Sequence, residues 1–162
     1  MDNGTTALYT ASREGNLDIV RLLCERGAVL DVQRTDNGST SLCMASYNGH
    51  LDIVLLLCER GAALDLQCTD GRTALYVAAQ NGHLDVVRLL CERGAALDLQ
   101  RKDGSTALQI AVAKCHLGIV RLLCESGCDT RVQYKGNIAY AMAKSVHGSS
   151  APITLLLEKY PH

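Results

Sequence analysis

One block of sequence recurs four times along the chain, at a spacing of 33 or 34 residues. Its clearest copy reads DGRTAL at 70–75, NGHLDVV at 81–87 and LLCERGA at 89–95, with close copies one period away on either side. A repeat of this length is typical of a stacked array, in which each unit contacts only its neighbours. This limits the possible folds more than any single motif does.

A single unit predicts two short helices joined by turns. Asp70-Gly71 is typical of a hairpin tip, Thr73 is suited to cap the helix that follows it, and Gly82 is suited to end that helix in the left-handed conformation. A second helix is predicted over 84–93, and Gly94 ends it. Both helices fall below the roughly 12–15 residues at which isolated helices become marginally stable. Each unit therefore needs neighbours to cover its apolar sides.

We assign the whole chain, 1–162, to one array. The predicted units are 2–35, 36–69, 70–102, 103–134 and a degenerate capping unit, 135–162. The first spacing is one residue longer than the next because Asn37 extends a turn. An atypical last unit is expected, since its outer side faces water.

Composition excludes several classes of partner. The net charge of −1 argues against nucleic acid, which requires a clustered positive field. No run of 18 apolar residues is present, so no membrane span is expected. The first residues have no basic start and no apolar stretch, so we expect a cytoplasmic or nuclear protein rather than a secreted one. We also expect a monomer.

The chain has eight cysteines, and four of them hold one place in successive units: Cys24, Cys58, Cys91 and Cys124. Equivalent points on stacked helices lie about 8–10 Å apart, beyond the roughly 7 Å between Cα atoms that a disulfide allows. We expect these four to be buried as small apolar side chains. Among the other four, Cys68 lies near a hairpin tip, where it is a candidate for an intermolecular disulfide. No metal site is predicted.

The pattern resembles the ankyrin repeat over nearly the whole chain. The matching elements in the third unit are Thr73-Ala74-Leu75, Ala78-Ala79, Gly82-His83, Val86-Val87, Leu89-Leu90 and Gly94-Ala95, and they recur in the first four units. The resemblance implies an all-α solenoid of stacked helix-turn-helix units with β-hairpin loops. It also implies that His50, His83 and His116 are structural and that partners bind a concave groove of hairpin tips and first helices.

Two departures from the family pattern bear on stability. The Pro and His that the family places beside the first helix are missing, so other side chains must tie the hairpins together or the array is less stable. Cys115 also stands where Gly15, Gly49 and Gly82 end the first helix in other units. We expect a local distortion there, or a turn of another type.

Positions that differ between units and face water are candidates for recognition. The candidate partner-binding residues are Arg13, Tyr47, Asn48, Arg72, Tyr76, Gln80, Lys102 and Lys114. Tyr and Arg are enriched among residues that dominate binding energy at interfaces. Two interpretations remain open: a groove epitope around Tyr47, Tyr76, Arg72 and Lys102, or ordinary solvated positions with Tyr9 and Tyr76 packed between units.

The sequence predicts a non-catalytic module that binds a protein or peptide in its groove. The alternative is a structural spacer within a longer array. No phosphate-binding loop and no nucleophile–base pair is suggested, so neither an enzyme nor a cofactor is expected.

Overall fold

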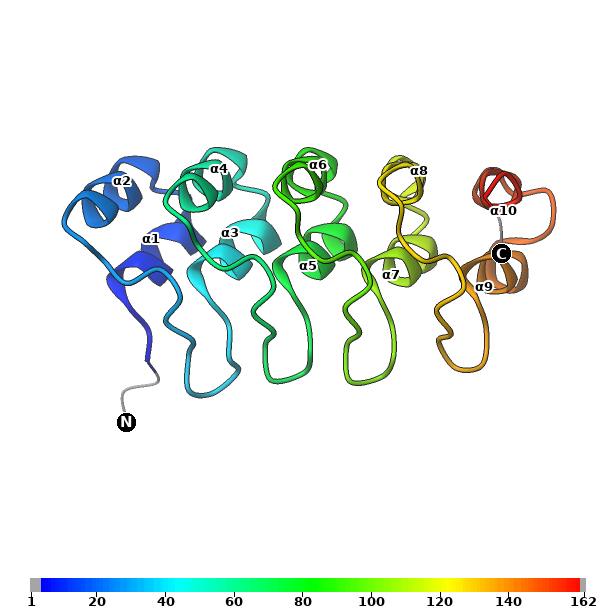
Figure 1. The fold of residues 1–162 in the computed structure, drawn as a ribbon, viewed down its shortest axis with the longest axis horizontal. Helices are drawn as coiled ribbons and strands as arrows, with labels where there is room; N and C mark the ends of the chain where they lie inside the picture. The colour runs from blue at the N-terminus through cyan, green and yellow to red at the C-terminus, as the bar shows by residue number, and fades with distance from the viewer. Residues whose placement is uncertain (1–3, 161–162) are drawn as a thin grey trace.

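The chain folds into helix pairs stacked along one axis (Figure 1). A computed structural model describes residues 4–160; residues 1–3 and 161–162, which fall in the first and last predicted units, lie outside that part. Within residues 4–160 the ten helices are α1 (Ala7–Glu14), α2 (Leu17–Glu25), α3 (Ser41–Asn48), α4 (Leu51–Glu59), α5 (Ala74–Asn81), α6 (Leu84–Glu92), α7 (Ala107–Ala113), α8 (Leu117–Glu125), α9 (Ala139–His147) and α10 (Pro152–Leu157). The predicted all-α solenoid is confirmed.

The helices form two rows. The first helices of the pairs, α1, α3, α5, α7 and α9, lie in one row, and the second helices lie in the other (Figure 1). Loops extend from the row of first helices and turn back at residues 35–39, 68–72, 101–105 and 134–137. These loops turn like hairpins, but among residues 4–160 the only β-pairing is an isolated bridge between Tyr134 and Asn137. We call the side made by these turns and by α1, α3, α5 and α7 the hairpin face.

Threonine and glycine fix the limits of the first helices, as the sequence predicts. In three units the threonine Oγ1 accepts the backbone N–H three residues on, at 3.0–3.2 Å; these are Thr6, Thr40 and Thr73. Each bond satisfies a helix N–H that has no partner within the helix. The same helices end at glycines in the left-handed conformation, Gly15, Gly49 and Gly82.

The fourth unit keeps the left-handed turn without glycine. Cys115 has a φ of 59°, close to the values of its glycine counterparts, so the turn does not change type. The difference is local: α7 ends at Ala113 and has seven residues, where α1, α3 and α5 have eight. A side chain in this conformation costs about 1–2 kcal/mol, so the fourth unit carries strain that the others avoid.

One continuous apolar core runs through the array. The first helices α1, α3, α5 and α7 each contribute a fully buried leucine, and α4, α6 and α8 each contribute a pair of buried aliphatic residues; they are Leu8, Leu42, Leu75, Leu108, Val54, Leu57, Val87, Leu90, Val120 and Leu123. Burying each such side chain stabilises the fold by about 1.5–3 kcal/mol. Ala45, Ala78 and Ala111 are also fully buried, and their small side chains let successive first helices lie close together.

Two glutamines tie the hairpins together in place of the missing histidine. The Nε2 of Gln33 donates to the backbone oxygens of Gly38 and Gln67, both at 2.9 Å. The Nε2 of Gln67 donates in the same way to Gly71 at 2.9 Å and to Gln100 at 3.0 Å. Each glutamine thus closes its own turn and holds the next one, so the sequence does compensate for the lost family residue.

The four cysteines that hold one place in successive units, called the ladder cysteines below, differ in their burial. Cys124 is buried, whereas Cys24, Cys58 and Cys91 are half-buried and pack against the edge of the core. The predicted burial is therefore only partial for three of them, whereas Cys124, at the same place in its helix, is buried. Burial still raises the pKa of these three thiols above its usual value.

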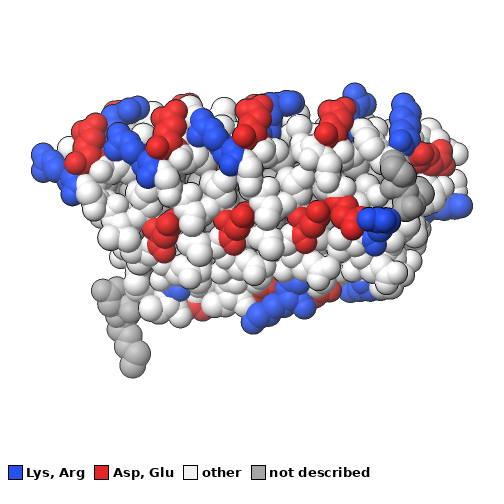
Figure 2. All heavy atoms as spheres, in the orientation of Figure 1, with Lys and Arg blue, Asp and Glu red and all other residues white. Residues whose placement is uncertain are grey.

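The second helices present a repetitive charged surface. Basic and acidic side chains alternate along their row (Figure 2), and exposed Arg88 and Glu92 on α6 illustrate the pattern. Among residues 4–160, no helix is long and apolar enough to cross a bilayer. The same residues contain no cluster of three or more His, Cys, Asp or Glu side chains suited to hold a metal ion.

Candidate functional site

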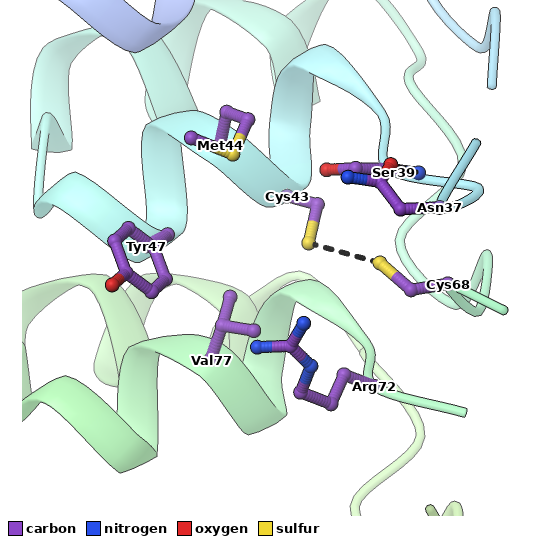
Figure 3. A pocket seen from close by; sticks show the side chains of 8 residues that line it. All are labelled: Asn37, Ser39, Cys43, Met44, Tyr47, Cys68, Arg72 and Val77. Carbon is purple, nitrogen blue, oxygen red and sulfur yellow. Dashed lines mark hydrogen bonds between the residues drawn. The ribbon is translucent and has the colours of Figure 1, made fainter. Parts of the chain in front are cut away.

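A hollow opens on the hairpin face between the second and third helix pairs (Figure 3). We call it the α3–α5 pocket. Its cavity volume is about 110 Å³, and it is lined by Asn37, Ser39, Cys43, Met44, Tyr47, Cys68, Arg72 and Val77. The residues come from α3, from α5 and from the two hairpins beside them. Two of the predicted partner-binding residues, Tyr47 and Arg72, therefore lie in one pocket.

One contact in the wall of the pocket is built from small side chains in this unit. In the first unit, the guanidinium of Arg34 lies over the ring of Tyr9, 5.2 Å from its centroid. Arg101 lies beside Tyr76 in the third unit. The equivalent positions in the second unit are Cys68 and Cys43. Two thiols occupy far less volume than an arginine and a tyrosine, so smaller groups form this part of the wall in the second unit.

The rim of the pocket is amphipathic. Tyr47 is 43% exposed, whereas Tyr9 and Tyr76 on the equivalent side of other units are buried. Arg72 is half-buried, and its Nε lies 2.7 Å from Oδ2 of Asp70. Val77 and Met44 supply the apolar lining between them (Figure 3). Such a rim suits an apolar group flanked by polar ones.

A buried hydroxyl lines the pocket without a firm partner. Ser39 is 4% exposed, and its Oγ has no hydrogen-bond partner of good geometry among the described residues, although it lies near both thiols. A buried polar atom left in this way costs about 1–3 kcal/mol. A ligand or water in the pocket would remove that cost.

The two thiols of the pocket interact directly. The Sγ atoms of Cys43 and Cys68 lie 3.6 Å apart (Figure 3). The hydrogen bond from Cys43 is the largest influence on Cys68, and with the charge of Arg72 it outweighs burial and lowers the pKa of Cys68 to about 7. The same hydrogen bond, together with burial, raises the pKa of Cys43 well above its usual value.

Cys68 is thus not the exposed hairpin-tip thiol that the sequence suggested. Its side chain is only 8% exposed and faces Cys43 within the same chain. Burial beside Cys43 disfavours the intermolecular disulfide for which this thiol was a candidate, and the hypothesis stays untested.

Tyr76 also differs from its expected place. Only 2% of the residue is exposed, and its hydroxyl lies 3.1 Å from Oγ of Ser105, between the third and fourth units. Tyr9 is buried as well. The alternative interpretation, in which these two tyrosines pack between units, describes them correctly. Tyr76 therefore has almost no surface to offer a partner.

The remaining predicted residues spread along the hairpin face. Arg13 and Asn48 are neighbours, since Nδ2 of Asn48 donates to the backbone oxygen of Arg13 at 3.1 Å. Lys102 is exposed in the hairpin that follows the one containing Arg72. Its backbone N–H donates to the backbone oxygen of Asp70 at 2.9 Å. Lys114 is exposed at the end of α7, and Gln80 is half-buried on α5. A role of these residues in binding stays a prediction.

Other hollows are lined mainly by residues that recur in each unit. Two open ones, of about 360 and 300 Å³, lie between the starts of successive second helices; one is lined by Gly15, Leu17 and residues 49–53, the other by Gly49, Leu51 and residues 82–86. Because they recur almost unchanged, they offer nothing that distinguishes one unit from another. A smaller one of about 90 Å³ lies between Tyr76 and Tyr134, where Arg101 and Asp103 face each other.

Sequence reasoning missed the pairing of Cys43 with Cys68 and the lining by Met44 and Val77. A pair of positions 25 residues apart in each unit could have indicated the pairing. This offset joins Tyr9 to Arg34 and Tyr76 to Arg101, and it also joins the two cysteines. Comparing one position across the units does not reveal a contact between two different positions of a unit.

Comparison with known families supports the same architecture. A family model described as ankyrin repeats (3 copies) matches residues 1–68 and 60–134. A comparison with curated protein sequences finds none that matches this chain. Ankyrin repeats are in general protein–protein interaction modules and are generally non-catalytic. With a match over most of its length and the stacked helix pairs described above, the chain belongs to the ankyrin repeat family.

Proposed function

We propose that this chain binds a protein or peptide segment on its hairpin face, centred on the α3–α5 pocket. The observation that carries the proposal is the combination of an apolar hollow, an exposed Tyr47 at its rim and a buried Ser39 hydroxyl without a firm partner. Binding sites for side chains commonly combine apolar walls with a few placed polar groups.

The pocket suits one apolar anchor of the partner. Its volume of about 110 Å³ leaves room for an aliphatic side chain against Val77 and Met44. Removing that side chain and the Tyr47 ring from water supplies binding energy. Arg72 is already paired with Asp70, so it orients polar groups at the rim rather than neutralising a free acidic residue.

Positive charge beyond the pocket favours a partner with acidic residues beside the anchor. Lys102 and Lys114 are exposed on the same face, whereas Arg13 is paired with Glu14 at 2.8 Å. Electrostatic complementarity of this kind raises the association rate and fixes the orientation of the partner. Among residues 4–160, the basic candidates on this face without an ion pair are therefore Lys102 and Lys114.

A peptide library displayed on phage tests the proposal without a known partner. Selection on the intact chain should enrich peptides that share one apolar anchor with acidic neighbours. Tyr47→Ala and Arg72→Glu should each weaken the selected peptides at least tenfold, with unchanged circular dichroism. Arg88→Ala, on the charged row of second helices, is the matched control and should bind normally.

The proposal fails if the selected peptides bind the Tyr47→Ala and Arg72→Glu variants as tightly as the unaltered chain. The alternative is a structural spacer, which the repetitive charged surface of the second helices would suit. It is favoured if selection on the intact chain enriches no common sequence. We expect the chain to act as a monomer in either role, and its net charge of −1 does not favour nucleic acid.

A further inference from the structure

One contact recurs in each of the first three units, between the third residue of the first helix and a residue 25 positions later. It joins Tyr9 to Arg34 and Tyr76 to Arg101, and Gln109 and Tyr134 line one hollow in the fourth unit. In the second unit both members of this contact are cysteines, with their Sγ atoms 3.6 Å apart. A change of one member alone would leave a thiol against an arginine or a tyrosine. The two positions instead carry a matched pair.

The pair is placed where a small oxidant can reach it. Both sulfurs line the α3–α5 pocket, which is open to solvent and holds about 110 Å³ (Figure 3). A cavity needs only about 10–15 Å³ to admit one water molecule, and hydrogen peroxide is little larger. The ladder cysteines, by contrast, lie one per unit, and Cys115 is exposed at a helix end.

We propose that Cys43 and Cys68 are a redox-active dithiol that hydrogen peroxide converts to a reversible intrachain disulfide. The sulfurs must approach from 3.6 Å to about 2.05 Å. A shift of this size is within reach of side-chain rotation and a small movement of the 68–72 turn. The bond would join α3 to the hairpin that leads into the next unit.

The chemistry assigns different roles to the two sulfurs. Cys68 is the nucleophile, because the hydrogen bond from Cys43 stabilises its thiolate at neutral pH. Its sulfur attacks one peroxide oxygen, the O–O bond breaks, and the sulfur is oxidised to a sulfenic acid while the departing hydroxide takes a proton and becomes water. Cys43 then attacks the sulfenic sulfur, the S–O bond breaks, and the second hydroxide leaves as water with the Cys43 proton. Two thiols and one peroxide thus give one disulfide and two waters.

Peptide mapping without reductant tests the proposal directly on the full chain. Trypsin places Cys43 together with Cys58 in peptide 35–60 and Cys68 in peptide 61–72, so fragmentation of the linked peptides must locate the bond at Cys43; Cys124 and Cys128 share peptide 122–131. After brief treatment with a few equivalents of hydrogen peroxide, we expect peptides 35–60 and 61–72 to become linked, and dithiothreitol to separate them. A link within 122–131 would mark the other close pair of cysteines and is distinguishable by mass.

Three variants separate the roles. Cys43→Ser should yield a sulfenic acid at Cys68 that dimedone traps, with no link, whereas Cys68→Ser should leave Cys43 unoxidised on the same timescale. Cys128→Ser is the matched control and should form the link as fast as the unaltered chain. Unchanged circular dichroism establishes that each variant is folded.

The proposal is overturned if peroxide leaves 35–60 and 61–72 unlinked, or if the link forms equally fast in urea, where the folded contact is absent. The test requires no binding partner, so its outcome is independent of the proposed function. If that function also holds, the disulfide would alter the wall of the α3–α5 pocket, and oxidised chain should bind the selected peptides with a different affinity from reduced chain.

Discussion

The imidazole Nε2 of His83 lies 2.9 Å from the backbone oxygen of Tyr47, which belongs to the preceding unit. The same relationship joins the other units, from His50 to Arg13 at 3.1 Å, from His116 to Gln80 at 3.3 Å and from His147 to Val112 at 2.8 Å. Each acceptor is among the last carbonyls of a first helix, which have no partner within that helix. The histidines are thus structural ties between units, as the resemblance implied.

Replacing His83 with alanine should destabilise the fold by about 0.5–1.5 kcal/mol, the usual net value of a hydrogen bond. The Tyr47 carbonyl would lose its side-chain partner, and the third unit would be held less firmly against the second. Urea unfolding followed by circular dichroism measures the difference. Arg88→Ala, exposed on α6, is the control and should change stability by less than about 0.5 kcal/mol. Equal losses in the two variants would contradict the role assigned to His83.

Gly49 is predicted to be less replaceable than Gly61, although both have positive φ values, 75° and 85°. A Cβ on Gly49 would lie 2.5 Å from Nδ1 of His83, whereas a Cβ on Gly61 would meet no atom within 4 Å. Each alanine variant carries the backbone strain of about 1–2 kcal/mol. The loss of unfolding free energy should be about 1 kcal/mol larger for Gly49→Ala than for Gly61→Ala, because Gly49→Ala also displaces the His83 hydrogen bond.

A double-mutant cycle identifies the source of that difference. In a chain that already carries His83→Ala, the extra cost of Gly49→Ala over Gly61→Ala should disappear, since the contact between the two positions is gone. An undiminished difference would mean that the cost of Gly49→Ala arises elsewhere in the turn.

Cys115→Gly should stabilise the chain. Glycine relieves the side-chain strain at φ 59°, and its greater freedom in the unfolded state offsets part of that gain. A net increase of about 0.5–1 kcal/mol in the free energy of unfolding is expected. Cys115→Ser keeps the strain while removing the thiol, and it should leave stability unchanged. A similar gain from serine would attribute the effect to the thiol instead.

Local features of the fold were predictable from the sequence because local interactions decide them. Thr73 caps α5 and Gly82 ends it through contacts within a few residues. The recurrence of the block indicated that the units stack. Features that a repeated unit decides by itself were therefore recovered.

The candidate site was recovered only in part, because it depends on contacts between distant positions. Tyr47 and Arg72 were recognised as variable and water-facing, and both line the pocket. Tyr76 stands at a position that varies equally between units, but its side chain packs between units. Variation at a position does not show in which direction the side chain points. The wall of the pocket contains the contact between Cys43 and Cys68, which a comparison of single repeat positions does not reveal.

Asp103 is predicted to make part of the stability depend on pH. Its Oδ1 accepts the backbone N–H and the hydroxyl of Ser105 at 3.0 and 2.6 Å, and its Oδ2 lies 3.1 Å from Nη1 of Arg101. Partial burial alone would raise the pKa of this carboxyl, but the Ser105 hydrogen bonds and the Arg101 charge together hold it below its usual value. The ionised form is therefore favoured in the folded chain.

The direction of the pH effect follows from this lowered pKa. The ionised carboxylate stabilises the fold at pH values above the unfolded pKa of about 3.9, and the contribution is lost as pH falls through the lower folded value. Asp103→Asn keeps an acceptor oxygen but removes the charge, so it should be less stable than the unaltered chain at pH 7. Urea midpoints should converge as pH falls from about 4 to about 2. A difference that stayed constant over this range would mean that the asparagine disturbs the turn by its shape, because only the loss of ionisation can make the difference vanish in acid.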